Sequence, residues 1–91
     1  MIVKFHPDVK RKDFKNVDNS IKKLFLKALE KIKNNPLIWK ELKTPLWGFR
    51  KMYFADKKFR IVYKIKNNII YIIAVGKREN KLVYKNTQKR I

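Results

Sequence analysis

Hydrophobic and polar positions follow a helical period in the first third of the chain. Between residues 18 and 33, apolar side chains recur every three or four positions, and lysines fill most positions between them. The apolar set is Ile21, Leu24, Phe25, Ala28, Leu29 and Ile32. This spacing predicts an amphipathic helix that begins at Asp18 or Ser20 and buries one face. Asn34-Asn35-Pro36 ends it, because proline lacks a backbone N–H and disfavours helical geometry in the preceding residue.

The second half of the chain has the pattern of extended strands. Three segments rich in β-branched and aromatic residues cover 49–54, 59–66 and 69–77. Residues 55–58 separate the first two strands, and Asn67-Asn68, a favourable pair for a tight hairpin, separates the second and third. This order predicts an antiparallel meander. The third strand is apolar on both sides, which predicts a central place in the sheet with helices covering one face.

The N-terminal residues predict a strand followed by a short helix. Residues 2–5 form a strand candidate, and His6-Pro7-Asp8 can start a helix over 7–15, because proline suits the first helical turn. A lone histidine beside a proline is read as a helix-start residue rather than as a catalytic one.

The remaining segments connect and end the predicted domain. Residues 37–48 are expected to form an irregular connection in which Trp39 and Trp47 cap the core, and residues 79–91 to form a short basic helix. The sequence therefore predicts a single α+β domain over 1–91. Its two N-terminal helices would pack on a mainly antiparallel sheet in the order β-α-α-β-β-β-α.

Charge changes the picture more than any other feature of the composition. The chain carries 25 Lys and Arg against 7 Asp and Glu, for a net charge of +18. Such an excess is typical of proteins that bind nucleic acid, and it predicts a polyanionic partner whose affinity falls steeply with salt. The alternative is a compositional bias, since Lys, Ile and Asn are all abundant here and some lysines could simply be solvated.

Several classes of chemistry are excluded by residues that the sequence lacks. Without cysteine there are no disulfides or thiolates, and one His with seven scattered acids makes a metal site improbable. Two glycines cannot build a phosphate-cradling loop, so no cofactor is expected. No apolar run approaches the roughly 20 residues that span a bilayer. A soluble, cytoplasmic protein without membrane contact is therefore expected.

Lysine, arginine and tyrosine remain, and these can act on RNA. RNA carries its own nucleophile, the 2′-hydroxyl, so a protein can promote cleavage by aligning it and stabilising the phosphate. A planar guanidinium suits phosphate because it gives two parallel hydrogen bonds. Arg60 lies at the start of one strand, and Arg78 lies at the end of the next strand. The hairpin that joins these strands should therefore bring both arginines to the same end of the sheet. Tyr84 comes six residues later, close enough to fold back.

The strand sequences FRIVYKI and IIAVGKREN, followed by LVY, closely resemble the second half of the RelE-type toxins of toxin–antitoxin systems. The order of the preceding elements and the length agree with that family too. The resemblance implies a metal-independent endoribonuclease that cuts mRNA in the ribosomal A site, in contact with ribosomal RNA. The products would be a 2′,3′-cyclic phosphate and a 5′-hydroxyl, and the partner a cognate antitoxin protein.

The resemblance also implies roles for individual residues. By position, Arg60 is similar to the arginine that stabilises the transition-state phosphate, and Arg78 to the arginine proposed to protonate the leaving 5′-oxygen. Tyr84 is similar to the tyrosine that stacks on a substrate base and assists the 2′-hydroxyl. Gly76 would let the backbone bend or pass close to RNA, and Lys77, the cation that follows it, would contact phosphate.

The first strand of the meander departs from the family pattern. The family has a Lys-x-Lys pair there. Counting back from Arg60 with a hairpin of the same length as in the family places this pair at Lys51 and Tyr53, so the second lysine is absent. A shift of one residue would select Arg50 and Met52 instead. Strand alternation places Met52 on the core side, which favours Lys51 as the catalytic lysine. Tyr53 and Arg50 are expected to contact the substrate.

Two other functions remain open at this point. ParE-type relatives use the same fold to poison DNA gyrase without cutting RNA, although they generally lack the combination of cations and tyrosine seen here. A module that binds RNA or the ribosome without catalysis is the third interpretation.

Overall fold

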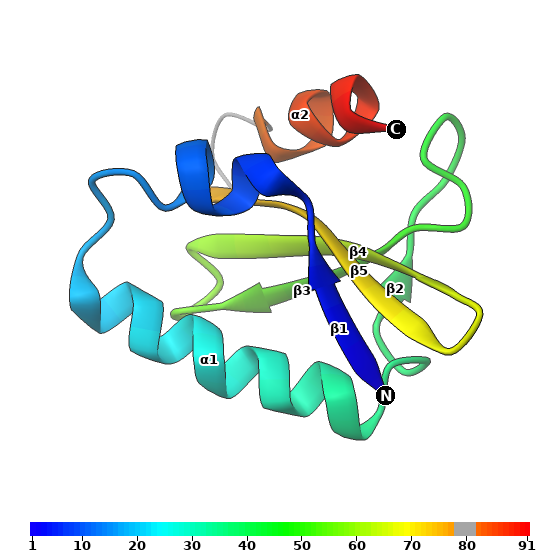
Figure 1. Cartoon of the computed structure of the whole chain (residues 1–91), viewed down its shortest axis with the longest axis horizontal. Coiled ribbons are helices and arrows are strands. Elements are labelled where there is room, and N and C mark those ends of the chain that lie inside the picture. Colours follow the sequence, from blue (N-terminus) through cyan, green and yellow to red (C-terminus); the bar gives the residue numbers. More distant parts are fainter. Residues whose placement is uncertain (78–81) are drawn as a thin grey trace.

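Five strands form one sheet in the order β1-β5-β4-β3-β2 in the computed structural model, which describes residues 1–77 and 82–91 (Figure 1). The strands are β1 (Ile2–Phe5), β2 (Lys40–Glu41), β3 (Arg50–Phe54), β4 (Phe59–Lys66) and β5 (Ile69–Lys77). β1 runs parallel to β5, whereas the other neighbouring pairs are antiparallel. The mainly antiparallel sheet and the predicted meander are confirmed, and β5 lies inside the sheet between β1 and β4.

The hairpin turns explain why the meander could be located from sequence. Asn67 and Asn68 both have positive φ, at 52° and 61°, as the tight turn that matches strand twist requires. Asparagine tolerates this conformation better than most residues. The turn fixes the pairing of β4 with β5, in which Lys66 lies opposite Ile69.

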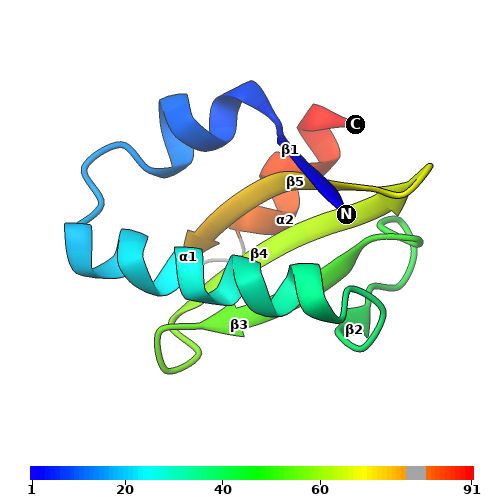
Figure 2. The same cartoon turned by 60° about the horizontal axis from the view of Figure 1, so that its bottom comes forward.

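Helix α1 (Asn19–Asn34) covers one face of the sheet (Figure 2). Its buried residues are Phe25, Ala28, Leu29 and Ile32, which repeat the predicted apolar stripe. They pack with the inward side chains of β3, β4 and β5 in the main core. Tyr63 of β4 is fully buried there, and its hydroxyl donates to the carbonyl of Pro36 at 2.6 Å. Burial raises the pKa of Tyr63 to about 12, although nearby Arg50 opposes part of that shift.

The expectation of two N-terminal α-helices is wrong. The segment predicted as a helix over 7–15 contains a five-residue π-helix, η1 (Val9–Asp13), so in the described residues α1 is the one α-helix that precedes the meander. The amide of Phe14 donates to the carbonyl of Val9, five residues earlier. The segment has cations at three of its five positions and Val9 as its buried apolar residue, so it has no apolar stripe to support a longer helix.

The connection between α1 and β3 also differs from expectation. It contains β2, which pairs Lys40 with Lys51 and Glu41 with Arg50. Trp39 packs partly buried against the core, but Trp47 is 74% exposed, so the prediction that both tryptophans cap the core is wrong for Trp47. Neighbouring Leu46 and Phe49 are buried in its place and occupy the available apolar space.

The C-terminal helix α2 (Leu82–Arg90) lies on the face of the sheet opposite α1 (Figure 1). A second, smaller core joins it to the sheet. The buried members of that core are Leu46, Phe49, Val62, Ala74 and Val83. In the described residues, no helix is long and apolar enough to cross a membrane. The face under α2 carries Lys51, Tyr53, Arg60 and Gly76 among the residues that the sequence singled out.

Candidate functional site

Arg60 occupies the centre of a row of residues that crosses the sheet under α2. It lies opposite Tyr53 of β3 on one side and opposite Gly76 of β5 on the other. The Arg60 side chain is directed to the α2 face, because the alternate residues Ile61 and Tyr63 belong to the main core. Arg60 is only 6% exposed, so it is not a solvated residue at a strand end.

Two tyrosine rings enclose the Arg60 guanidinium. Its Cζ atom lies 5.2 Å from the centre of the Tyr53 ring and 4.9 Å from the centre of the Tyr84 ring. These distances suit a cation–π interaction, in which the negative ring face attracts the cation. The predicted approach of Tyr84 to Arg60 is therefore confirmed, and α2 is the element that carries the second ring.

The polar atoms of this arrangement are incompletely paired. Among the described residues, neither the buried Nε of Arg60 nor the buried hydroxyl of Tyr84 has a hydrogen-bond partner. The ion pairs within residues 1–77 and 82–91 involve other cations, so no carboxylate neutralises Arg60 there. Most buried polar groups in proteins are hydrogen-bonded, and an unpaired guanidinium N–H is a donor that a bound anion can satisfy.

Lys51 extends the arrangement along β3. Its Nζ donates to the Tyr53 hydroxyl at 3.1 Å and lies 5.1 Å from the centre of the same ring. Both residues are half-buried on the face of α2, whereas Met52 between them is buried in the main core, as the alternation predicted. We call Lys51, Tyr53, Arg60 and Tyr84 the Arg60 cluster.

Two other residues from the sequence analysis do not join the Arg60 cluster. Arg50 lies opposite Tyr63 and therefore points to the face of α1. Its guanidinium donates to the carbonyls of Leu37 and Trp39 at 3.1 and 2.8 Å, which gives Arg50 a structural role in holding the loop after α1. Lys77 pairs across the sheet with Phe59, and it is exposed at the end of β5.

Two further expectations concern the end of β5. Arg78 lies outside the described residues, so its position relative to Arg60 stays a prediction. Gly76 lies under α2, where an added Cβ would come 3.5 Å from the Cβ of Val83, which is an ordinary contact. The close neighbour of Gly76 in this structure is therefore the helix that carries Tyr84.

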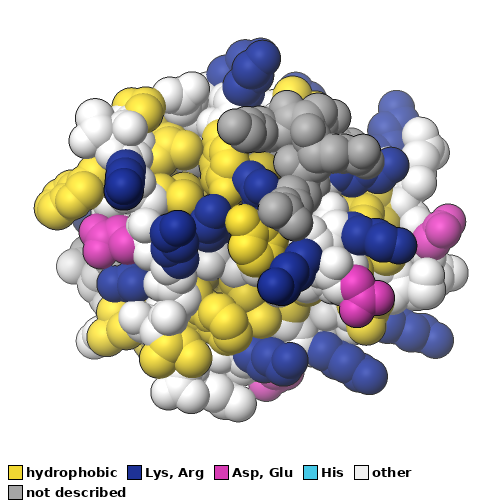
Figure 3. Space-filling view, turned by 180° about the vertical axis from the view of Figure 1, so that it is seen from behind, with side chains coloured by type: hydrophobic (Ala, Val, Ile, Leu, Met, Phe, Trp, Pro, Cys, Tyr) yellow, Lys and Arg dark blue, Asp and Glu magenta, His cyan; other side chains and the backbone are white. Residues whose placement is uncertain are grey.

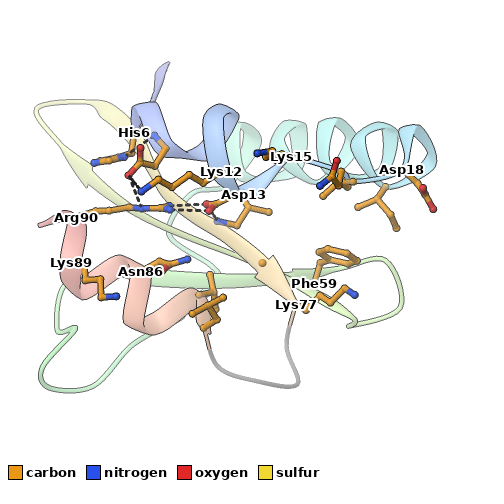
Figure 4. Close-up of a pocket in the computed structure, with 18 of the residues that line it drawn as sticks. His6, Lys12, Asp13, Lys15, Asp18, Phe59, Lys77, Asn86, Lys89 and Arg90 are labelled. Atoms are coloured by element: carbon orange, nitrogen blue, oxygen red, sulfur yellow. Dashed lines mark hydrogen bonds and ion pairs between the residues drawn. The ribbon is translucent and has the colours of Figure 1, made fainter.

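Basic side chains are spread over the molecule around these elements. Figure 3 shows Lys and Arg side chains among hydrophobic ones on the face seen from behind, with fewer acidic ones between them. A groove of about 930 Å³ lies between η1 and α2 (Figure 4). Its cationic lining includes Lys12, Lys15, Lys77 and Lys89. In the described part of the chain, no group of three or more His, Asp or Glu side chains is arranged to hold a metal ion.

Comparison with known proteins places the chain in a family. Residues 3–82 match the family described as ParE toxin of type II toxin–antitoxin system, parDE. A protein of Escherichia coli described as RelE-like toxin is 33% identical over 91 residues, which cover 98% of this chain and 95% of that protein. The chain therefore belongs to the RelE/ParE superfamily of toxins of toxin–antitoxin systems, and the resemblance noted in the sequence is confirmed.

Solved structures of E. coli toxins have the same fold. A variant of RelE in the free state matches at a TM-score of 0.80 and 21% identity, over 99% of this chain and 96% of that one. The intact E. coli RelBE toxin–antitoxin complex matches at a TM-score of 0.71 and 17% identity, over 87% of this chain and 98% of that one. At these identities the agreement concerns the fold alone.

Proposed function

We propose that this protein is a ribosome-dependent endoribonuclease of the RelE type, which cuts mRNA and so inhibits translation. The observation that carries the proposal is the buried guanidinium of Arg60, held between two phenol rings with its Nε unpaired among the described residues. A phosphate oxygen would supply the missing acceptor through a charge-assisted hydrogen bond. The family relationship supports the same assignment, because the E. coli relative is described as a RelE-like toxin.

The proposed reaction uses the 2′-hydroxyl of the RNA as its nucleophile. Attack on the adjacent phosphorus forms a 2′,3′-cyclic phosphate and breaks the bond to the 5′-oxygen, which leaves as a hydroxyl once it gains a proton. Arg60 would stabilise the negative charge that develops on the phosphate oxygens, in a site where burial excludes competing water. Arg78 is proposed as the donor of the proton to the 5′-oxygen.

Lys51 and Tyr53 are proposed to act beside the 2′-hydroxyl. Their hydrogen bond of 3.1 Å places the Lys51 amino group and a phenol together at the edge of the Arg60 cluster. The Lys51 amine, in its uncharged form, would accept the proton that the 2′-hydroxyl loses as its oxygen attacks phosphorus. The chain has this Lys–Tyr pair where the family has two lysines, so a phenol replaces the second ammonium. Tyr84 would turn its ring from Arg60 to a substrate base when RNA enters, because unstacked RNA bases are commonly held by aromatic side chains.

The proposed partners follow from charge and from the relatives. A chain with a net charge of +18 is suited to the surface of the ribosome, which is a dense array of phosphates. The structures of the E. coli toxin with its antitoxin make a cognate antitoxin the expected protein partner of this chain. Purification of the protein from its native host should yield an acidic or amphipathic companion, and recovery of the toxin without any companion would contradict this part of the proposal.

A cleavage assay on programmed ribosomes tests the proposed activity. The wild-type chain should produce new mRNA 5′ ends in the A-site codon, and Arg60→Ala should reduce the cleavage rate by about a hundredfold or more. Lys66→Ala is the matched control, because Lys66 is an exposed cation on the same strand and is six residues away from Arg60. Intact message with the wild-type chain, or equal losses in the two variants, would contradict the proposal.

The matching family also includes proteins named ParE, which makes inhibition of DNA gyrase the second candidate. The two activities are distinguished by their targets. Gyrase inhibition would leave mRNA intact on the ribosome and would block DNA supercoiling, and neither effect would require the Arg60 guanidinium to meet a phosphate. Parallel assays of supercoiling and mRNA cleavage with the same preparation therefore separate the candidates.

A further inference from the structure

Arg90, the last residue of α2, forms a buried ion pair with Asp13, the last residue of η1. Its Nη1 and Nη2 donate to the two carboxylate oxygens of Asp13 at 2.7 and 2.9 Å (Figure 4). The side chains are only 6% and 3% exposed. Such a bidentate pair fixes orientation as well as distance. The hydrogen bonds that Arg90 donates to Asp13 raise the pKa of Arg90 against the opposing effect of burial, so the guanidinium stays charged.

The same two side chains also bind the edge of β5. The amide of Val75 donates to Oδ2 of Asp13 at 2.9 Å, and Nη1 of Arg90 donates to the carbonyl of Ile73 at 2.9 Å. These backbone groups follow Ile72, the last β5 residue that pairs with β1 in the described structure. The ion pair therefore takes the place of a neighbouring strand along this part of the edge, and it joins η1, β5 and α2 at one point.

In the described residues, the other attachments of α2 to the sheet are mainly apolar, and they include the Tyr84 ring, which packs against the second core. The helix has nine residues, and its buried side chains are Val83 and Thr87. The Thr87 hydroxyl donates to the carbonyl of Val83 within the helix, so it makes no polar link to the sheet. A helix this short is marginal by itself and depends on tertiary contacts. Val83 anchors the first turn, whereas Arg90 anchors the last.

We propose that Asp13 and Arg90 are positioning residues, which hold α2 against the sheet so that Tyr84 stays within reach of Arg60 and the substrate. In the described residues, the hydrogen bonds and ion pairs of Asp13 and Arg90 go to groups outside the Arg60 cluster, so they would act through the helix. The link to cleavage depends on the ribonuclease activity proposed above, whereas the attachment of α2 does not. Two separate measurements can therefore test the two parts.

Hydrogen exchange of the free protein tests the attachment. Arg90→Met preserves much of the side-chain length but removes the ion pair, and amides of α2 should then exchange at least about tenfold faster. Amides of β4 should keep their wild-type rates. Lys89→Met is the matched control, because it removes an exposed cation from the same turn. Unchanged exchange in α2 of the Arg90→Met variant, or equal acceleration in β4, would overturn the attachment.

A double-mutant cycle tests the link to Tyr84. Arg90→Met and Tyr84→Ala should each lower the catalytic rate on programmed ribosomes, and the double variant should be no slower than Tyr84→Ala alone, because both changes remove the same ring from the site. Arg90→Lys, which keeps a charge near Asp13, should recover part of the rate. Independent, multiplicative losses would overturn the positioning role. If the wild-type chain cut no RNA, the proposed function would fail while the exchange result still decided the attachment.

Discussion

Arg60 is an unusual residue at this position because a charged side chain is buried without a carboxylate partner in the described structure. Aromatic rings stabilise it partly, since cation–π contacts contribute roughly 0.5–2 kcal/mol each. The unpaired Nε nevertheless leaves a donor without an acceptor. Residues that violate a local rule of stability are expected at functional sites, where a ligand completes the arrangement. Arg60 is therefore the residue whose replacement should separate stability from activity.

The ring and the hydroxyl of Tyr84 should contribute unequally. The ring contacts Arg60 at 4.9 Å, whereas the hydroxyl has no hydrogen-bond partner among the described residues. Tyr84→Phe should therefore change the unfolding free energy by less than about 0.5 kcal/mol and keep most of the cleavage rate. Tyr84→Ala should lower that rate at least about tenfold, because it removes the stacking surface. A Phe variant as slow as the Ala variant would assign the function to the hydroxyl instead.

The Arg78 side chain is expected to supply the proton that the leaving 5′-oxygen needs. Arg78→Ala should abolish cleavage on programmed ribosomes, while the thermal unfolding midpoint stays close to that of the wild type. The result is read from mapped 5′ ends and from a melting curve of the same preparation. Wild-type inhibition of growth by the Arg78→Ala variant would refute this role.

Tyr63 should make the fold sensitive to alkali. Its pKa is raised to about 12 in the folded chain, above the model-peptide value of 10.0, so folding favours the protonated phenol. The raised pKa contributes fully to the free energy of unfolding below pH 10, and this contribution, up to about 3 kcal/mol, is lost as the pH rises towards 12. Urea unfolding should therefore show the wild type losing stability relative to Tyr63→Phe over this interval. A constant difference between them would contradict the assignment.

Helix α1 offers a comparison between two apolar residues within one element. Ile32 is fully buried in the main core, whereas Leu26 is 60% exposed. Ile32→Ala should lower the unfolding free energy by about 2–5 kcal/mol, because it removes buried methyl groups and leaves a cavity. Leu26→Ala should change it by less than about 0.5 kcal/mol. Urea titration measures both values, and similar losses would mean that the helix presents a different face to the sheet.

The elements that the sequence predicted well are those with a strong local period. The apolar stripe of α1 and the alternation of β3 each left one side of the element as the only possible core face. The Asn67-Asn68 turn then fixed the pairing of β4 with β5. This pairing brings the end of β5 near Arg60, and because Tyr84 follows soon after β5, it also predicted the approach of Tyr84 to Arg60. Local patterns were therefore sufficient for the meander, whereas Lys51 and Tyr53 of the Arg60 cluster were selected from the family resemblance together with strand alternation.

Other features depended on contacts between distant parts of the chain. Nothing near Asp13 in the sequence indicates that it pairs with Arg90, 77 residues later. The π-helix η1 depends on the packing of Val9, and the exposure of Trp47 depends on Leu46 and Phe49 filling the second core. The burial of Arg60 was missed for the same reason, because α2 is the element that covers it.

At the scale of the whole molecule, net charge should govern affinity for RNA. A surface with a net charge of +18 releases counterions when it binds phosphates. If about four phosphates of a single strand are neutralised, the logarithm of the binding constant should fall with that of the salt concentration at a slope near −3. Fluorescence titration of a short RNA at several salt concentrations measures this slope. Affinity independent of salt would mean that the cationic surface does not contact the RNA backbone.

Cleavage by this protein, as proposed, requires the RNA to supply its own nucleophile to a site built from side chains. The most direct test places a single 2′-deoxynucleotide at the cleaved linkage of an otherwise unmodified message on programmed ribosomes. The wild-type protein should no longer cut at that linkage, whereas the all-ribose message should be cut and end in a 2′,3′-cyclic phosphate. Cleavage at the deoxy linkage would contradict this mechanism, because the broken bond would then require a different nucleophile.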